Sequence, residues 1–160
     1  MTDKALTTCL WFDTQAEEAA SFYTGIFKDS RRGRVYRHTE AGPGTPGSVV
    51  LVEFELNGQK FSALNGGPEH TFNEAVSIVV PCADQAEVDY YWDSLLAGGG
   101  REVACGWLRD KYGLAWQIVP ARLFEMIADP DGAKAARATQ AMLAMTKLDL
   151  AALERAYAGD

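Results

Sequence analysis

Two stretches of this chain decide its fold: Thr7-Thr8-Cys9-Leu10-Trp11-Phe12 before Gln15-Ala16-Glu17, and Ser77-Ile78-Val79-Val80-Pro81-Cys82 before Gln85-Ala86-Glu87. In each, an apolar run typical of a buried strand is followed by the start of an amphipathic helix. The pattern recurs 70 residues later, from position 7 to position 77, a period too long for a solenoid repeat. It indicates two paired modules of one domain, with a concave pocket between the two halves.

The first module is expected to span residues 5–67 and the second residues 75–120. Their helices are predicted at 16–27 and 84–96. Three strand-like stretches follow each helix: part of 28–38, 49–56 and 60–65 in the first module, and 101–104, 106–110 and 114–119 in the second. Asn57-Gly58 is a strong hairpin signal. The glycine- and proline-rich run 41–47 predicts a flexible loop, which either covers a binding site or simply connects two strands.

After Pro120 the composition becomes rich in alanine, and a helical tail is predicted over 122–158. Its apolar residues need a surface to cover, which could be the outer face of the sheet or a second copy of the chain. These residues are Met142, Leu143, Met145, Leu148, Leu150 and Leu153.

The bulk composition describes an acidic globular protein. A chain of 160 residues with 48% apolar residues is expected to form a single domain, 1–160, around one substantial core. Lys and Arg total 15 against 22 Asp and Glu, a net charge of -7. This balance argues against nucleic-acid and anionic-membrane partners, which require a basic surface. The sequence shows no signal-peptide pattern and no apolar run of membrane-spanning length, so a cytoplasmic location is expected.

Residues that could carry metal or nucleophilic chemistry are few. The chain contains only His38 and His70, and its cysteines, Cys9, Cys82 and Cys105, match no zinc or CxxC spacing. Cysteines in strands usually act as small buried hydrophobes. Neither strand-to-helix junction, 12–16 or 82–86, contains the glycine that a dinucleotide-type cofactor loop needs, and no Walker-type phosphate loop is present. No cofactor is therefore expected.

The densest cluster of informative residues is 105–120, where Trp107 and Trp116 bracket a hairpin. Gln117 is a polar residue within an otherwise apolar strand. A buried polar side chain needs partners, so Gln117 either bonds inside the core or faces a wet cavity. Both interpretations stay open from the residues alone.

Several of these motifs together resemble a known family. The opening Cys9-Leu10-Trp11-Phe12-Asp13, the run Asn65-Gly66-Gly67-Pro68, Phe72-Asn73-Glu74-Ala75, and the 105–120 block carry the similarity. The chain resembles the PhnB-like group described as 3-demethylubiquinone 3-methyltransferase, within the vicinal oxygen chelate (glyoxalase, bleomycin resistance, dioxygenase) superfamily. The resemblance implies an α+β fold in which paired βαβββ modules form a half-barrel-like mixed sheet, here with a C-terminal helical extension, and it implies a homodimer.

The superfamily's catalysis rests on a divalent metal held by His or Glu on the first strand and Glu on the last strand of each module. The matching positions here are Thr7 or Thr8, Ser77 or Ile78, and Gln117, and the stretch 59–67 contains no acid. Neutral oxygens bind divalent cations too weakly to replace carboxylate and imidazole, so no metal site is expected.

Three functions follow as hypotheses. The first is a metal-free protein that binds a small, partly apolar molecule in the pocket, with Asn65, Ser77, Trp107 and Gln117 as ligand contacts. The second is an enzyme, either a methyltransferase, as the family description implies, or a metal-dependent isomerase or lyase. The third is a structural dimer whose pocket is filled by its own side chains.

Overall fold

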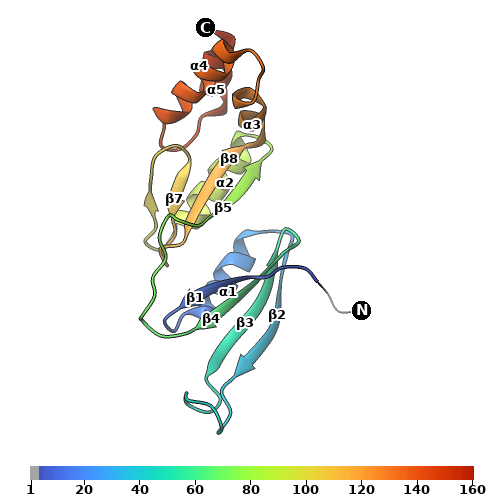
Figure 1. Ribbon diagram of the computed structural model, residues 1–160, viewed down its shortest axis with the longest axis vertical. Helices are drawn as coiled ribbons and strands as arrows, with labels where there is room; N and C mark the ends of the chain where they lie inside the picture. Colours follow the sequence, from blue (N-terminus) through green and yellow to red (C-terminus); the bar gives the residue numbers. More distant parts are fainter. Residues whose placement is uncertain (1–3) are drawn as a thin grey trace. The chain divides into compact units, whose positions relative to one another are not determined.

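The computed structural model describes residues 4–160 and divides the chain into two compact units, one ending at Thr71 and the other running from Phe72 to Asp160 (Figure 1). The boundary between the units falls in the irregular segment that the sequence predicts between the two modules. The single-domain expectation concerns how the units associate and stays a prediction.

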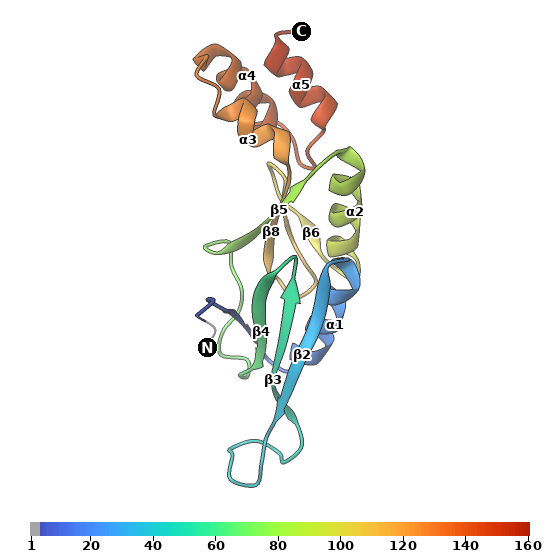
Figure 2. The same ribbon diagram turned by 90° about the vertical axis from the view of Figure 1, so that its right-hand side faces the viewer.

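The first unit is a four-stranded mixed sheet with one helix. Its elements are β1 (Thr8–Phe12), α1 (Ala16–Ile26), β2 (Ser30–Arg37), β3 (Val49–Leu56) and β4 (Gln59–Asn65). The strand order is β1-β4-β3-β2, with β1 parallel to β4 and the other neighbours antiparallel. The loop between β2 and β3 contains the glycine- and proline-rich run and extends beyond the sheet (Figure 2).

Helix α1 covers one face of this sheet because its small and aromatic residues recur at helical spacing. Ala16, Ala19, Ala20 and Tyr23 are fully buried. The Tyr23 ring stacks on Phe54 of β3 at a centroid distance of 6.0 Å, within the range of favourable aromatic pairs. The opposite face of the sheet carries no helix from this unit (Figure 2).

The second unit repeats the same element order. It contains β5 (Ser77–Cys82), α2 (Gln85–Leu96), β6 (Arg101–Glu102), β7 (Trp107–Arg109) and β8 (Ala115–Pro120), in the sheet order β5-β8-β7-β6. Again the first and last strands are parallel and the remaining pairs antiparallel. The predicted α+β fold with paired βαβββ modules, mixed sheets and a helical extension is thus confirmed.

Strands β6 and β7 are shorter than the sequence analysis expects. Predicted at 101–104 and 106–110, they occupy 101–102 and 107–109. The reason is a tight turn in which Cys105 and Gly106 both have positive φ, 59° and 80°, a conformation that strands do not contain. Their N–H groups donate instead to the carbonyls of Met145 and Thr146 in the tail, at 2.8 Å each.

The C-terminal extension forms α3 (Ala121–Ile127), α4 (Gly132–Leu143) and α5 (Leu150–Ala158). These helices surround a small core at the end of β8, in which Val119, Leu123, Met126, Ala138, Leu148 and Leu153 are buried. Most of the apolar tail residues therefore pack against one another and against the end of β8, while Leu143 stays 61% exposed. Within residues 4–160, none of the helices combines the length and apolar character that crossing a membrane requires.

Candidate functional site

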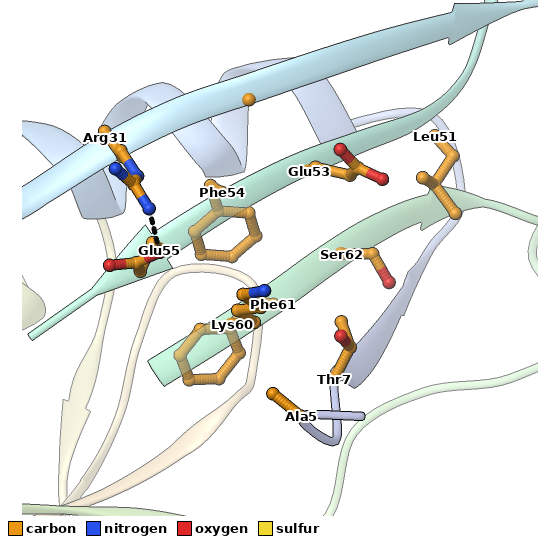
Figure 3. A pocket seen from close by; sticks show the side chains of 11 residues that line it. Ala5, Thr7, Arg31, Leu51, Glu53, Phe54, Glu55, Lys60, Phe61 and Ser62 are labelled. Atoms are coloured by element: carbon orange, nitrogen blue, oxygen red, sulfur yellow. Dashed lines mark hydrogen bonds and ion pairs between the residues drawn. The ribbon is translucent and has the colours of Figure 1, made fainter. Parts of the chain in front are cut away.

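The open face of the first sheet contains a hollow of about 540 Å³ (Figure 3). Alternation along β3 creates it: Val52, Phe54 and Leu56 are buried, and the intervening side chains of Leu51, Glu53 and Glu55 lie on the opposite, open face. Neighbouring strands add Arg31, Lys60 and Ser62 to the lining, and the segment before β1 adds Thr7. All of the lining belongs to the first unit.

Charged side chains in the hollow have different partners. The Arg31 guanidinium donates to the Glu55 carboxylate at 2.7 Å. The Glu53 carboxylate accepts a hydrogen bond from the Tyr36 hydroxyl at 2.9 Å. In the described part of the chain, Glu53 forms no ion pair with Arg, Lys or His. The hollow therefore contains one carboxylate paired with a cation and one that is not.

Glu53 is not among the site residues predicted from the sequence. The superfamily's metal ligands lie on the first and last strands of each module, and β3 is neither of these strands. The alternation Val52-Glu53-Phe54-Glu55-Leu56 was a usable signal, because period two places both carboxylates on one face of a strand.

Asn65, predicted as a ligand contact, lies at the end of β4 in the first unit. Its side-chain oxygen accepts from the Ala16 N–H at 2.8 Å, and its side-chain nitrogen donates to the Val49 carbonyl at 3.1 Å. The Ala16 N–H belongs to the first turn of α1, where backbone donors have no partner within the helix. Both ends of the Asn65 amide thus connect structural elements.

The other three predicted contacts lie together in the second unit. Gln117 on β8 is opposite Trp107 on β7 and Val79 on β5. Its side-chain nitrogen donates to the Ser77 hydroxyl at 2.9 Å. Gln117, Ser77 and Trp107 are all half-buried. Gln117 therefore fits neither a fully buried core position nor a side chain that only faces a wet cavity. It bonds within the protein and also remains partly accessible.

The positions that match the superfamily's metal ligands carry neutral groups in both units. The Thr8 hydroxyl accepts from Gln59 at 3.4 Å, and Ser77 is bonded to Gln117. Among residues 4–160, no three His, Cys, Asp or Glu side chains come together in a ligand-like group. Hydroxyl and amide oxygens are poor substitutes for carboxylate and imidazole, so the donor set does not fit the divalent metal of the superfamily.

The cysteines differ in their accessibility. Cys82 is fully buried, and burial, with a smaller contribution from the Glu87 charge, raises the pKa of its thiol to about 12. Since the thiolate is the nucleophilic form, Cys82 is unreactive at neutral pH. Cys9 is exposed and Cys105 half-buried. His70 packs its ring against Trp11 at a centroid distance of 4.8 Å.

The strand-to-helix connections are short and contain no glycine. At α2, the Asp84 side chain accepts from the Glu87 N–H at 2.9 Å, and the Glu87 side chain accepts from the Ala83 N–H at 2.7 Å. This arrangement is similar to a capping box, except that Glu87 bonds to the N–H of the residue before the cap. At α1, Asn65 takes a comparable role. Side chains of the protein thus already satisfy backbone donors at both helix starts.

Residues 4–119 match the family model described as 3-demethylubiquinone-9 3-methyltransferase. A solved structure from Bacillus cereus, described as a putative 3-demethylubiquinone-9 3-methyltransferase, PhnB protein, is 37% identical. The match covers 74% of this chain and all of that one, with a TM-score of 0.66.

More distant structures share the fold. Protein PA1353 from Pseudomonas aeruginosa is 17% identical, with a TM-score of 0.58 over 71% of this chain and 95% of that one. The fosfomycin resistance protein FosX from Mesorhizobium loti is 15% identical, with a TM-score of 0.56 over 81% of this chain and all of that one. Among curated proteins, no match was found.

Proposed function

Because the chain belongs to the 3-demethylubiquinone-9 3-methyltransferase family, a PhnB-like group with the vicinal oxygen chelate fold, we propose that it binds a small, partly apolar molecule on the open faces of its sheets. The hollow on the first sheet is the observation that carries this proposal. Its volume of about 540 Å³ falls within the usual range for small-molecule sites.

The lining of the hollow supports the same conclusion. Ligand sites combine apolar area for affinity with a few polar groups for orientation. Leu51 and Ala5 provide apolar surface, and Glu53, Ser62 and Thr7 provide polar groups around the same space (Figure 3).

The second unit is proposed to contribute contacts of its own. Ser77, Trp107 and Gln117 form a partly accessible group in which an indole lies beside an amide and a hydroxyl. Asn65 is proposed to act indirectly, by holding the start of α1 against the end of β4. We also propose that the protein is cytoplasmic and, as the resemblance to the family implies, that it forms a homodimer. Light scattering coupled to gel filtration tests the dimer.

A thermal-shift screen against a metabolite collection tests binding, because a ligand that binds only the folded protein must raise the Tm. Thr7→Trp places a large ring in the hollow, and Thr39→Trp places the same ring in the exposed β2–β3 loop as a matched control. We expect a hit to lose its effect on Thr7→Trp and to keep it on Thr39→Trp. A hit that stabilises both variants equally would place binding elsewhere.

Methyl transfer is the second candidate, favoured by the description of the matched family. Calorimetry with S-adenosylmethionine tests it directly. Specific micromolar binding would support a methyltransferase. Heat that does not saturate would leave binding without methyl transfer as the function.

A further inference from the structure

The hollow on the first sheet has an ordered chemical layout, which can be read from strand register. Residues opposite one another on neighbouring strands form rows across the open face. One row is charged, with Lys60 opposite Glu55 and Glu55 opposite Arg31. The next is polar, with Cys9 opposite Ser62 and Ser62 opposite Glu53. The third is apolar and aromatic and meets the hollow at Leu51: Trp11, Leu64, Leu51 and Tyr36.

The first of these rows carries one surplus positive charge, because two cations flank a single carboxylate. Glu55 is 23% exposed at its side chain and is paired with Arg31. Lys60 stands opposite Glu55 on β4. A ligand that enters the hollow therefore meets two cations and one anion that already neighbour one another.

Glu53 in the polar row differs. It is half-buried, and its partner among the described residues is the neutral Tyr36 hydroxyl. A hydroxyl orients a carboxylate but does not neutralise it, and a negative charge that is partly withdrawn from water gains most from a cationic partner.

The space beside Glu53 is kept open by a glycine. Gly33 on β2 lies where a Cβ atom would come within 3.0 Å of the Glu53 Cβ, tighter than ordinary side-chain packing allows. The β2–β3 pairing shifts register between Arg32 and Val35, around the same position. Glu53 thus faces a hollow that no side chain from β2 fills at this point (Figure 3).

We propose that the hollow selects an organic cation, namely a primary amine attached to an apolar or aromatic body. The ammonium donates to the Glu53 carboxylate, which the Tyr36 hydroxyl orients. The apolar body lies along the row that contains Leu51 and Leu64, roughly 7 Å away along the strand, the span of two residues. The Ser62 hydroxyl, opposite Glu53, is placed to accept a hydrogen bond from another N–H of the ammonium group. This inference rests on the proposed function and gives the chemical class of its ligand.

Three probes of the same shape test the proposal: 3-phenylpropylamine, 3-phenylpropanol and 3-phenylpropanoate. Their dissociation constants are measured by NMR titration of the ¹⁵N-labelled full chain at neutral pH and low salt. We expect the amine to bind about tenfold more tightly than the alcohol, the difference typical of a hydrogen bond to a charged group. The carboxylate should bind most weakly. Perturbed amides should lie on β3 and β4.

Variants assign the preference to one residue. Glu53→Gln keeps the shape of the side chain, and the amine should then bind no more than about two- to threefold differently from the alcohol. Glu40→Gln, in the exposed β2–β3 loop, removes the same charge from the protein and should keep the preference of the unmodified chain. This control separates local recognition by Glu53 from the general attraction of an acidic protein for cations.

The outcomes separate two failures. If none of the three probes perturbs the hollow, the inference about the ligand is overturned, and the thermal-shift screen with Thr7→Trp decides separately whether the hollow binds a small molecule. If all three bind there with similar affinity, or if Glu53→Gln keeps the preference for the amine, the binding function stands and the inference about the ligand is overturned.

Discussion

Asp110 provides the sharpest test of how the second unit is held together. It is a carboxylate with 3% exposure in the turn between β7 and β8. One of its oxygens accepts from the N–H groups of Tyr112 and Leu114, at 2.9 and 3.1 Å. The other accepts from the Trp116 indole N–H at 2.9 Å. A single side chain thus satisfies three donors around the hairpin.

Asp110→Ala removes both acceptor oxygens and with them all three hydrogen bonds. A buried donor left without a partner costs about 1–3 kcal/mol. Tyr112 is only half-buried, so water can replace one of the bonds, and a total loss of about 3 kcal/mol is a reasonable sum for the other two. At about 4–8 °C per kcal/mol for a unit of this size, the Tm should fall by roughly 12–24 °C.

Tryptophan fluorescence during thermal unfolding measures this change, since Trp116 itself reports on the site. The matched control is Asp93→Ala in the same unit, where the carboxylate is 75% exposed and lies 3.6 Å from Lys147. Exposed ion pairs contribute little, so the control should melt within a few degrees of the unmodified chain. If Asp110→Ala behaves like Asp93→Ala, the three hydrogen bonds do not stabilise the unit as argued.

Three further predictions follow from other sites. Burial raises the pKa of the Cys82 thiol from 9.0 to about 12. The stability that comes from keeping this thiol protonated is therefore complete below pH 9 and is lost as the pH rises towards 12. Thiol labelling at pH 8 should detect Cys82 only after unfolding. Asn65→Ala should destabilise the first unit by about 1–2 kcal/mol in urea unfolding, because it leaves a buried N–H of α1 unpaired, and unchanged stability would contradict this role. Hydrogen bonds from Gln85 and then Lys147 lower the pKa of Asp89, so Asp89→Asn should lower the Tm at pH 7, and the difference from the unmodified chain should shrink as the pH falls below the usual carboxyl range. A difference that persists at pH 2 would show that charge is not the cause.

The sequence predicted most of the architecture because apolar periodicity dominates it. The bounds of β3 and β5 agree with prediction, since β3 ends at the Asn57-Gly58 turn and β5 is a continuous apolar run. Strand β2 was harder to delimit: as an edge strand with mainly exposed polar residues, it carries almost no apolar signal.

The site was less accessible to prediction because it depends on register. Two features of β2 distinguish Glu53 from other surface glutamates: the Tyr36 hydroxyl donates to its carboxylate, and Gly33 beside it has no side chain. Both features depend on how β2 pairs with β3. Asp110 was overlooked for a related reason. An aspartate in a hairpin resembles an ordinary turn residue until the strands bring the Trp116 indole to it.

The extension after β8 also changes what counts as the smallest piece of this protein able to fold. The family match ends at residue 119, yet the turn at Cys105 and Gly106 relies on tail carbonyls, and Gln85 of α2 bonds to the backbone of Leu148 and Leu150. Ending the chain at residue 119 would leave the N–H groups of Cys105 and Gly106 without their acceptors and would expose Val119 to solvent. The family match therefore covers less of the chain than the hydrogen bonds and the packing of the second unit require.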